Sequence, residues 1–209
     1  MRVYNRVAND KKECLTVLVN VSAGGEIAPP MVLYPYKLLP KNVALTIPPE
    51  WGVGCTESGW MNMDAFYEYV VNVFYEWLLE NKKKTMQVAL FMDGNTSHIS
   101  LPLSLFCKEK GIILVALLPN SNHLLQLLDV GVFPSVRVTW KNVVHEFRVK
   151  NNRAKLKRVD FAGEVKKCFE KSLIADTIKN SFKSAGLFPF DANNIEFSKV
   201  MRQTSGNIK

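Results

Sequence analysis

The sequence predicts an α/β protein in which a mixed sheet is flanked by helices, and three patterns lead to this prediction. Residues 14–21 and 27–36 are aliphatic, extended runs on either side of a Gly-rich turn at 22–26, which predicts an antiparallel hairpin. Two short apolar runs, 88–92 and 112–118, have the length of strands. They alternate with helical patterns, so the expected order is hairpin, helix, strand, helix, strand and further helices.

The first long helix is expected over residues 63–80, with Asn62 or Asp64 as the residue that caps its N-terminus. A second, short helix is expected over 101–111. In the long helix, apolar residues recur at helical spacing and form one stripe that faces the core: Phe66, Val70, Val73, Phe74, Trp77 and Leu78.

The segments near the strands lead to three further expectations. The prolines within 27–36 suit an edge strand or the start of a strand. Residues 38–60 are rich in Pro and Gly and predict an ordered loop anchored by Trp51 and Trp60. The run 112–118 is too uniformly apolar for a half-exposed strand, so we expect it to be buried on both faces.

The last third of the chain is expected to be helical. Residues 124–147 have a roughly helical spacing of apolar residues, and a start near Phe133 is the alternative, because Pro134 fits best in the first turn of a helix. Amphipathic patterns predict one or two more helices, over 160–173 and 175–186, with Gly186 as the stop signal.

The net charge of +8 is distributed unevenly along the chain. Residues 1–134 hold 11 Lys/Arg and 12 Asp/Glu, whereas residues 135–209 hold 16 Lys/Arg and 7 Asp/Glu. A basic final third indicates either a polyanionic partner, with nucleic acid the foremost choice, or a solvated helical surface. The densest basic cluster, a candidate for sequence-independent phosphate contact, comprises Lys150, Arg153, Lys155, Lys157 and Arg158.

Composition excludes several other classes of protein. The longest clean apolar run, 111–118, is far shorter than a membrane span, so no membrane partner is expected. The four cysteines lie far apart and form neither a CxxC pair nor a zinc-binding spacing with the three histidines. This pattern indicates reduced thiols in an intracellular protein.

Two aspartates stand beyond the predicted strands 88–92 and 112–118. Asp93 follows the first strand directly, and Asp129 comes after the second strand and a loop. Consecutive strands in such folds often lie side by side, so the two carboxylates can meet at one edge of the sheet. Carboxylates brought together in this way suit Mg²⁺ or Mn²⁺, although a lone Asp after a strand is more often a turn former or a helix cap.

The stretches around these aspartates resemble a known family. "LFMDGNTSHIS" and "GIILVALLPNSNHLLQLLDVGVF" are similar to the second and third acidic motifs of the DDE superfamily endonuclease domain of pogo-, Tigger- and jerky-type transposases. "ECLTVLVNVSAGGEIAPPMVLY" resembles the hairpin of that family, and "TIKNSFKSAGLFPFDANNI" resembles its C-terminal segment. The resemblance covers essentially the whole chain.

This resemblance implies an RNase H-like fold and three acidic residues that hold two Mg²⁺ or Mn²⁺ ions for DNA strand cleavage and transfer. Asp93 and Asp129 match the second and third acids, with 35 residues between them. The strand that carries the family's first aspartate is expected to be missing. The implied division is a partial catalytic domain at 1–145, a basic helical extension at 146–200 and a disordered tail at 201–209.

Three residues near the aspartates are candidates for supporting roles, and the sequence also departs from the family pattern in two places. His98 is expected near Asp93, and His123 and Gln126 are expected to orient Asp129 or contact the scissile phosphate; ordinary loop hydrogen bonds are the alternative. The family usually has proline where Leu127 stands and often histidine where Asn95 stands. These departures are typical of a decayed or repurposed copy.

Three functions follow as hypotheses. The first is a metal-dependent DNA endonuclease of transposase origin, in the nucleus, with DNA as partner and a homodimer as an open assembly state. The second is a catalytically inactive, domesticated module that binds DNA or a protein, because the first aspartate is not found and this chain alone is expected to be a poor nuclease. The third is a fragment that does not fold independently, because a missing strand leaves the hairpin edge unpaired.

Overall fold

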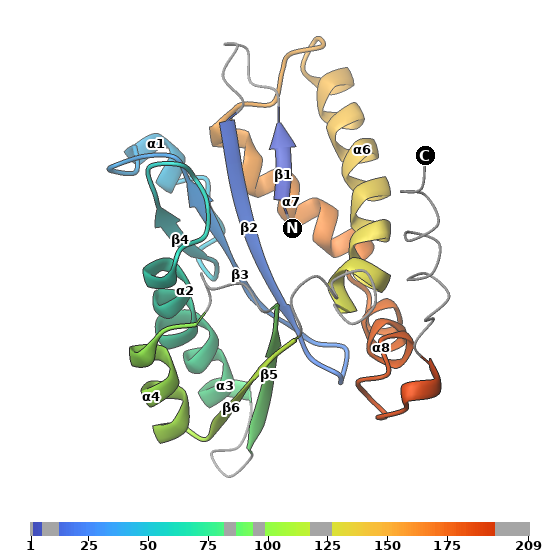
Figure 1. The fold of residues 1–209 in the computed structure, drawn as a ribbon. Helices are drawn as coiled ribbons and strands as arrows, with labels where there is room; N and C mark the ends of the chain where they lie inside the picture. The colour runs from blue at the N-terminus through green and yellow to red at the C-terminus, as the bar shows by residue number, and fades with distance from the viewer. Residues whose placement is uncertain (1, 6–12, 82–86, 94–98, 118–126, 195–209) are drawn as a thin grey trace, which may run out of the picture.

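The structure is a computed structural model that describes residues 2–5, 13–81, 87–93, 99–117 and 127–194. It confirms the expected mixed α/β class, with two small sheets flanked by helices (Figure 1). The first sheet has the strand order β1 (Arg2–Asn5), β2 (Glu13–Val21), β3 (Ile27–Tyr34) and β4 (Gly52–Cys55). The second sheet is the parallel pair β5 (Val88–Met92) and β6 (Ile112–Ala116).

The helices form two groups (Figure 1). The first group accompanies β5 and β6 and comprises α2 (Met63–Tyr69), the π-helix η1 (Val70–Phe74), α3 (Tyr75–Asn81) and α4 (Leu101–Glu109). The second group comprises the π-helix η3 (Leu128–Val132), α6 (Phe133–Lys150), α7 (Arg158–Ser172) and α8 (Ala175–Ser184). Two short pieces complete the described elements, α1 (Lys41–Ala44) and the 3₁₀ turn η4 (Ala192–Asn194).

The hairpin β2–β3 separates two hydrophobic cores because successive side chains of a strand point to opposite faces. Val17 and Val32 face the core shared with α6, α7 and α8. Met31 and Leu33 face the other core, which α2, η1, α4 and the β5–β6 pair complete. Both groups of helices therefore pack on the same hairpin, one group on each face. The hairpin is the scaffold that positions β5 as well as α6.

The hairpin and the long helix agree with the sequence-based expectation. β2 and β3 pair antiparallel across a turn in which Gly25 has a φ of +92°. The segment from α2 through α3 is helical, as predicted, and Asn62 caps it by accepting a hydrogen bond from the Ala65 N–H at 2.8 Å. The π-helical turn in its middle was not predicted. α7, α8 and the positive φ of Gly186 also match the prediction.

The prolines of β3 lie in its first half, as the start of a strand allows, although β3 as a whole is an inner strand between β2 and β4. A register shift between Leu18 and Asn20 of β2 lies opposite Pro29 and Pro30. On the other side, β4 pairs only with Met31–Tyr34 of β3, beyond the prolines. The missing N–H groups therefore fall at a bulge and outside the parallel ladder, where proline is tolerated.

The segment expected as one ordered loop contains structure of its own. Residues 38–60 include α1 and β4, which form where the sequence shows no strong pattern. Trp51 packs on Phe169 with ring centroids 5.9 Å apart, as an anchor should, but Trp60 is 37% exposed. A short strand before the hairpin, β1, was also not predicted; it contains no carboxylate and pairs with Glu13–Thr16 of β2.

The expectation that 112–118 is buried on both faces is wrong for β6. Ile112 is buried against the helices, but Ile113, on the opposite face, is 51% exposed. The reason is that the second sheet, as described, has only two strands, and its helices cover one face. The proposed tail at 201–209 lies outside the described residues. Residue 145 lies within α6, and the division of the chain into domains stays a prediction.

Candidate functional site

Asp93 is placed by the end of the β5–β6 pair. The two strands stay in register to their last residues, Met92 opposite Ala116, and the Leu117 N–H donates to the Met92 carbonyl at 2.9 Å. Met92 is buried, and Asp93 is the half-buried residue that follows it. The carboxyl ends of parallel strands are where α/β folds gather functional groups. Asp93 stands at such an end, as the sequence predicts.

Asp129 lies on the π-helix η3, which runs directly into α6. The apolar neighbours of Asp129 explain its position, because Leu127, Val132 and Phe133 are buried in the core of α6, α7 and α8. The carboxylate itself is about one-third exposed, with a side-chain accessibility of 33%. Wider π-helical turns inside helices occur frequently at functional sites, where they redirect a side chain.

Gly131 allows η3 to lie close against α8. A Cβ atom built at Gly131 would lie 2.1 Å from the Ser181 Oγ and 2.9 Å from the Ser181 Cα. Any larger residue would therefore push the two elements apart. Ser181 is itself buried and its hydroxyl donates to the Thr177 carbonyl at 2.7 Å, so it is held in place by its own helix.

The electrostatics of Asp129 connect it to Asp93. Burial raises the pKa of the Asp129 carboxyl, and repulsion from Asp93 raises the same pKa further. Arg137 acts in the opposite direction, with its guanidinium 4.0 Å from the Asp129 carboxylate. The two aspartates thus come within electrostatic reach of each other although they belong to different elements.

The donor set suits a hard cation. Two carboxylates that repel each other are stabilised when a divalent cation neutralises them. Mg²⁺ commonly binds through one or two carboxylates, with waters and substrate phosphates as its other ligands. Among the described residues no group of three or more His, Cys, Asp and Glu gathers at a metal-binding distance. The two aspartates are thus the described carboxylates that the family's acidic motifs point to, and a metal held by them stays a prediction.

Three residues predicted to assist this site, His98, His123 and Gln126, lie outside the described residues. The predicted basic cluster is described, and its first four members are exposed: Lys150, Arg153, Lys155 and Lys157. Arg158 differs, because its guanidinium stacks over the Tyr36 ring at 4.4 Å from the centroid. The cluster occupies the end of α6 and the connection to α7, which is the far end of α6 from Asp129.

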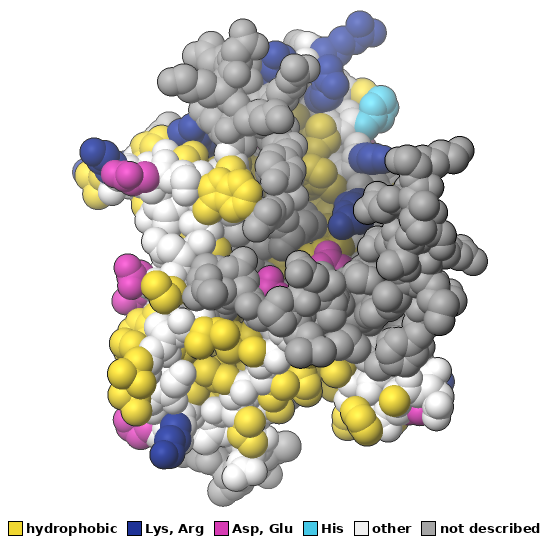
Figure 2. Space-filling view, viewed as in Figure 1, with side chains coloured by type: hydrophobic (Ala, Val, Ile, Leu, Met, Phe, Trp, Pro, Cys, Tyr) yellow, Lys and Arg dark blue, Asp and Glu magenta, His cyan; other side chains and the backbone are white. Residues whose placement is uncertain are grey.

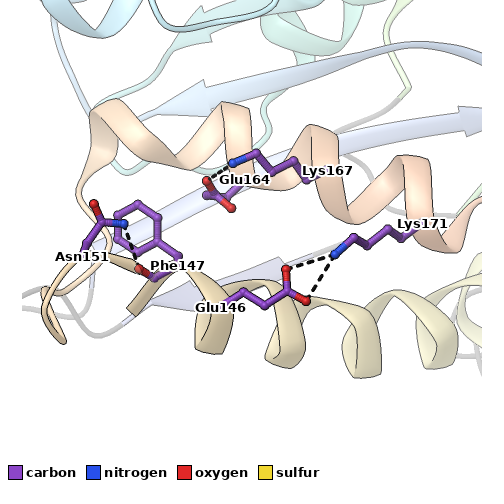
Figure 3. Close-up of polar contacts among 6 residues, drawn as sticks. All are labelled: Glu146, Phe147, Asn151, Glu164, Lys167 and Lys171. Carbon is purple, nitrogen blue, oxygen red and sulfur yellow. Dashed lines mark hydrogen bonds and ion pairs between the residues drawn. The ribbon is translucent and has the colours of Figure 1, made fainter. Parts of the chain in front are cut away.

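Helix α6 runs from the η3 turn that carries Asp129 to the basic cluster at its far end. Contacts with α7 fix the rotation of α6 about its own axis. The Lys171 Nζ on α7 pairs with the Glu146 carboxylate on α6, at 3.1 and 3.3 Å from its two oxygens (Figure 3). Val143 is buried between the helices, and Trp140 meets Phe161 edge-on with centroids 5.7 Å apart. These contacts set which side of α6 faces solvent.

The exposed side of α6 carries a row of basic residues that charge counting along the sequence missed. Arg137, Lys141, His145 and Arg148 are all exposed and recur at helical spacing. The sequence feature that could have predicted this row is its helical spacing, i, i+4, i+8 and i+11, which alternates with the apolar residues of the buried stripe. In Figure 2, acidic side chains lie near the centre of the face, and Lys and Arg side chains follow the α6 side above them.

Comparison with known families identifies the chain. Residues 12–182 match the family described as DDE superfamily endonuclease. The chain belongs to this family. The matched part of this DDE superfamily endonuclease contains both Asp93 and Asp129, and it includes all of α6 and α7. The superfamily resemblance expected from the acidic motifs is thereby confirmed, whereas the pogo and Tigger subfamily stays a prediction.

A curated relative gives a second comparison. Over 192 residues the DDE superfamily endonuclease chain is 27% identical to a protein named MFS-type transporter clz9, from Cochliobolus lunatus. The alignment covers 91% of this chain but 20% of that protein, so this chain spans about a fifth of its length. Within the described residues, no helix has the length and apolar character to span a membrane. No solved structure matches the chain.

Proposed function

We propose that this DDE superfamily endonuclease is a transposase-derived domain that binds DNA and cleaves phosphodiester bonds with Mg²⁺ or Mn²⁺ held by Asp93 and Asp129. The observation that supports this most is the family match over residues 12–182, which contains both Asp93, directly after β5, and Asp129, on η3. Each is an oxygen donor at the edge of a rigid element, as a hard divalent cation requires.

The residues of the proposed site have different roles. Asp93 and Asp129 would hold the metal, which when bound supplies Lewis acidity and lowers the pKa of bound water. Arg137, 66% exposed and beside Asp129, can donate hydrogen bonds to the non-bridging oxygens of a phosphate. The segment 137–158 carries eight Lys/Arg and one Glu, and its net charge of +7 attracts the DNA backbone.

The decisive experiment measures Mn²⁺ binding and supercoiled-plasmid nicking by the wild-type chain, Asp129→Asn and Glu57→Gln. Glu57→Gln is the matched control, because it also converts a carboxylate to an amide but lies in an exposed turn. We expect Asp129→Asn to lose both Mn²⁺ binding and nicking, while Glu57→Gln behaves as wild type. Equal Mn²⁺ binding and nicking by all three proteins would overturn the metal-site proposal.

The second candidate is a DNA-binding module without cleavage activity. It is favoured by the exposed basic residues of α6 and of its connection to α7, which suit phosphate contact with or without a metal site. In that case the chain binds duplex DNA with a steep salt dependence, and Asp129→Asn binds as tightly as wild type while neither protein nicks. A salt titration of binding with a slope near zero would exclude DNA binding altogether.

Three finer proposals depend on the same function. A DNA-binding nuclease acts where DNA is, so we propose a nuclear location, which imaging of a fluorescent fusion of the full-length gene product can test. We propose a homodimer as an assembly state, which sedimentation of the free and DNA-bound chain can test. His98, His123 and Gln126 keep their predicted roles beside the aspartates, and alanine variants of each can be compared with Asp129→Asn.

A further inference from the structure

The basic row on α6 has the geometry of a track. With 3.6 residues per turn, Arg137, Lys141, His145 and Arg148 share one side of the helix, clear of the buried stripe. At 1.5 Å per residue the row extends about 16 Å along the helix axis. It begins at Arg137, beside Asp129, and leads toward the exposed cluster that starts at Lys150.

Two members of the row, Lys141 and Arg148, differ from the lysines of α7 in their lack of acidic partners among the described residues. On α7, Lys166, Lys167 and Lys171 each pair with a glutamate, at 2.8, 2.6 and 3.1 Å. Across the parts of the chain that the structure describes, no carboxylate lies within ion-pair distance of Lys141 or Arg148, and Arg137 reaches Asp129 only at 4.0 Å.

We propose that this row is a phosphate-binding track that guides a DNA strand along α6, from the basic cluster at 150–157 to the carboxylates of Asp93 and Asp129. The proposal rests on the proposed DNA-binding function and deepens it by naming the surface. Duplex DNA presents one negative charge per roughly 1.7 Å of its axis, so a length of about 16 Å offers more phosphates than the row has cations. Each cation of the row can therefore find a phosphate without any particular base sequence.

The orientation of α6 makes the track a rigid one. Glu146 and its partner Lys171 lie on one flank of the buried stripe, and by helical geometry the basic row lies on the opposite flank. The row is thus fixed relative to the η3 turn that carries Asp129, since η3 and α6 are continuous. A phosphate bound at Arg137 would lie next to the Asp129 carboxylate.

The test is a filter-binding titration of a labelled 30-base-pair duplex of arbitrary sequence, in EDTA, between 50 and 200 mM KCl. The double variant Lys141→Gln/Arg148→Gln removes two cations of the row. Lys179→Gln/Lys183→Gln, on exposed positions of α8, removes the same charge elsewhere. Each lost phosphate contact reduces the slope of log K against log salt by about 1. We expect the row variant to reduce the slope by about 2, and the α8 variant to change it by much less.

The charge-conserving variant Lys141→Arg/Arg148→Lys controls for folding, and we expect it to keep the wild-type slope. A loss of slope in the row variant no greater than in the α8 variant would overturn the track, even with wild-type binding intact. A wild-type slope near zero would instead show that the proposed DNA-binding function itself fails. Nicking plays no part in this readout, so an inactive catalytic site leaves the test of the track unchanged.

Discussion

The guanidinium of Arg137 lies 4.0 Å from the carboxylate of Asp129, one π-helical turn and one α-helical turn further along the same continuous helix. Among the described residues, Arg137 is the cation that forms an ion pair with Asp129. It partly offsets the burial and the repulsion from Asp93 that act on Asp129. Asp129 keeps a raised pKa in spite of this cation, because the effect of burial is larger.

Replacement of Arg137 with Gln is therefore expected to strengthen divalent metal binding. Arg137 competes with the metal for the Asp129 carboxylate, and an exposed ion pair of this kind is worth up to about 1 kcal/mol. We expect Mn²⁺ to bind about two- to fivefold more tightly to Arg137→Gln, as measured by electron paramagnetic resonance. Arg148→Gln, at the other end of α6, serves as control and should leave Mn²⁺ affinity as in wild type. Weaker Mn²⁺ binding to Arg137→Gln would contradict the expectation that Arg137 and the metal compete for the Asp129 carboxylate.

Asp129 is expected to lower stability at neutral pH. Its folded-state pKa is raised above the unfolded value, first by burial and then by Asp93. The resulting stabilisation is fully present below the unfolded pKa, near 4, and is lost as the pH rises through the folded pKa. Asp129→Asn, which mimics the neutral carboxyl, should therefore raise the Tm at pH 7 in EDTA, by a few degrees at most, since 1 kcal/mol corresponds to about 2–4 °C in a chain of this size.

The same measurement repeated at lower pH supplies the control. The difference in Tm between wild type and Asp129→Asn should shrink as the pH falls toward 4, because the wild-type carboxyl then becomes neutral as well. Added Mn²⁺ should raise the Tm of wild type but not of the variant. If the wild-type protein were more stable than Asp129→Asn at pH 7 in EDTA, the upward direction of the Asp129 pKa shift would be refuted.

The elements predicted from the sequence are those whose patterns are local. The helical stripe from Phe66 to Leu78 and the apolar run of β5 show their periods within one window of sequence. β4, with the sequence Gly-Val-Gly-Cys, has little intrinsic preference for a strand and forms because β3 offers it a parallel edge. The exposure of Ile113 likewise depends on how many layers surround β6, which no local pattern records.

In the candidate site, too, local sequence patterns predict some features, whereas others depend on packing. The pairing of β5 with β6, which places Asp93 at the carboxyl end of a parallel pair, could be predicted from the tendency of consecutive strands to pair, whereas the shared metal site of Asp93 and Asp129 stays a prediction. Arg137 and the row on α6 were missed, because density of charge along the chain favours 150–158, where cations crowd together. On a helix the cations of one face are spaced three or four residues apart, and which face is exposed is decided by packing against α7.

Phe161 is expected to contribute far more to the placement of α6 than the ion pair beside it. Phe161 is buried and meets Trp140 edge-on, so Phe161→Ala should cost about 3–5 kcal/mol, a large share of the stability of a typical domain. Lys171 pairs with Glu146 in an exposed position, so Lys171→Gln should cost less than about 1 kcal/mol. Urea unfolding measures both free energies, and a larger loss from Lys171→Gln would refute this order.

Gly131 is expected to be the residue through which α8 controls the position of Asp129. In Gly131→Ala the new methyl group would overlap the Ser181 side chain, which lies 2.1 Å from the Cβ position at its Oγ. Overpacking of this kind costs about 1–3 kcal/mol and moves the backbone. We therefore expect a lower free energy of unfolding together with weaker Mn²⁺ binding, since Asp129 lies two residues away on the same turn. Adding Ser181→Gly removes the overlapping atoms and should restore part of both quantities. Unchanged stability in Gly131→Ala would show that η3 can move away from α8 at no cost.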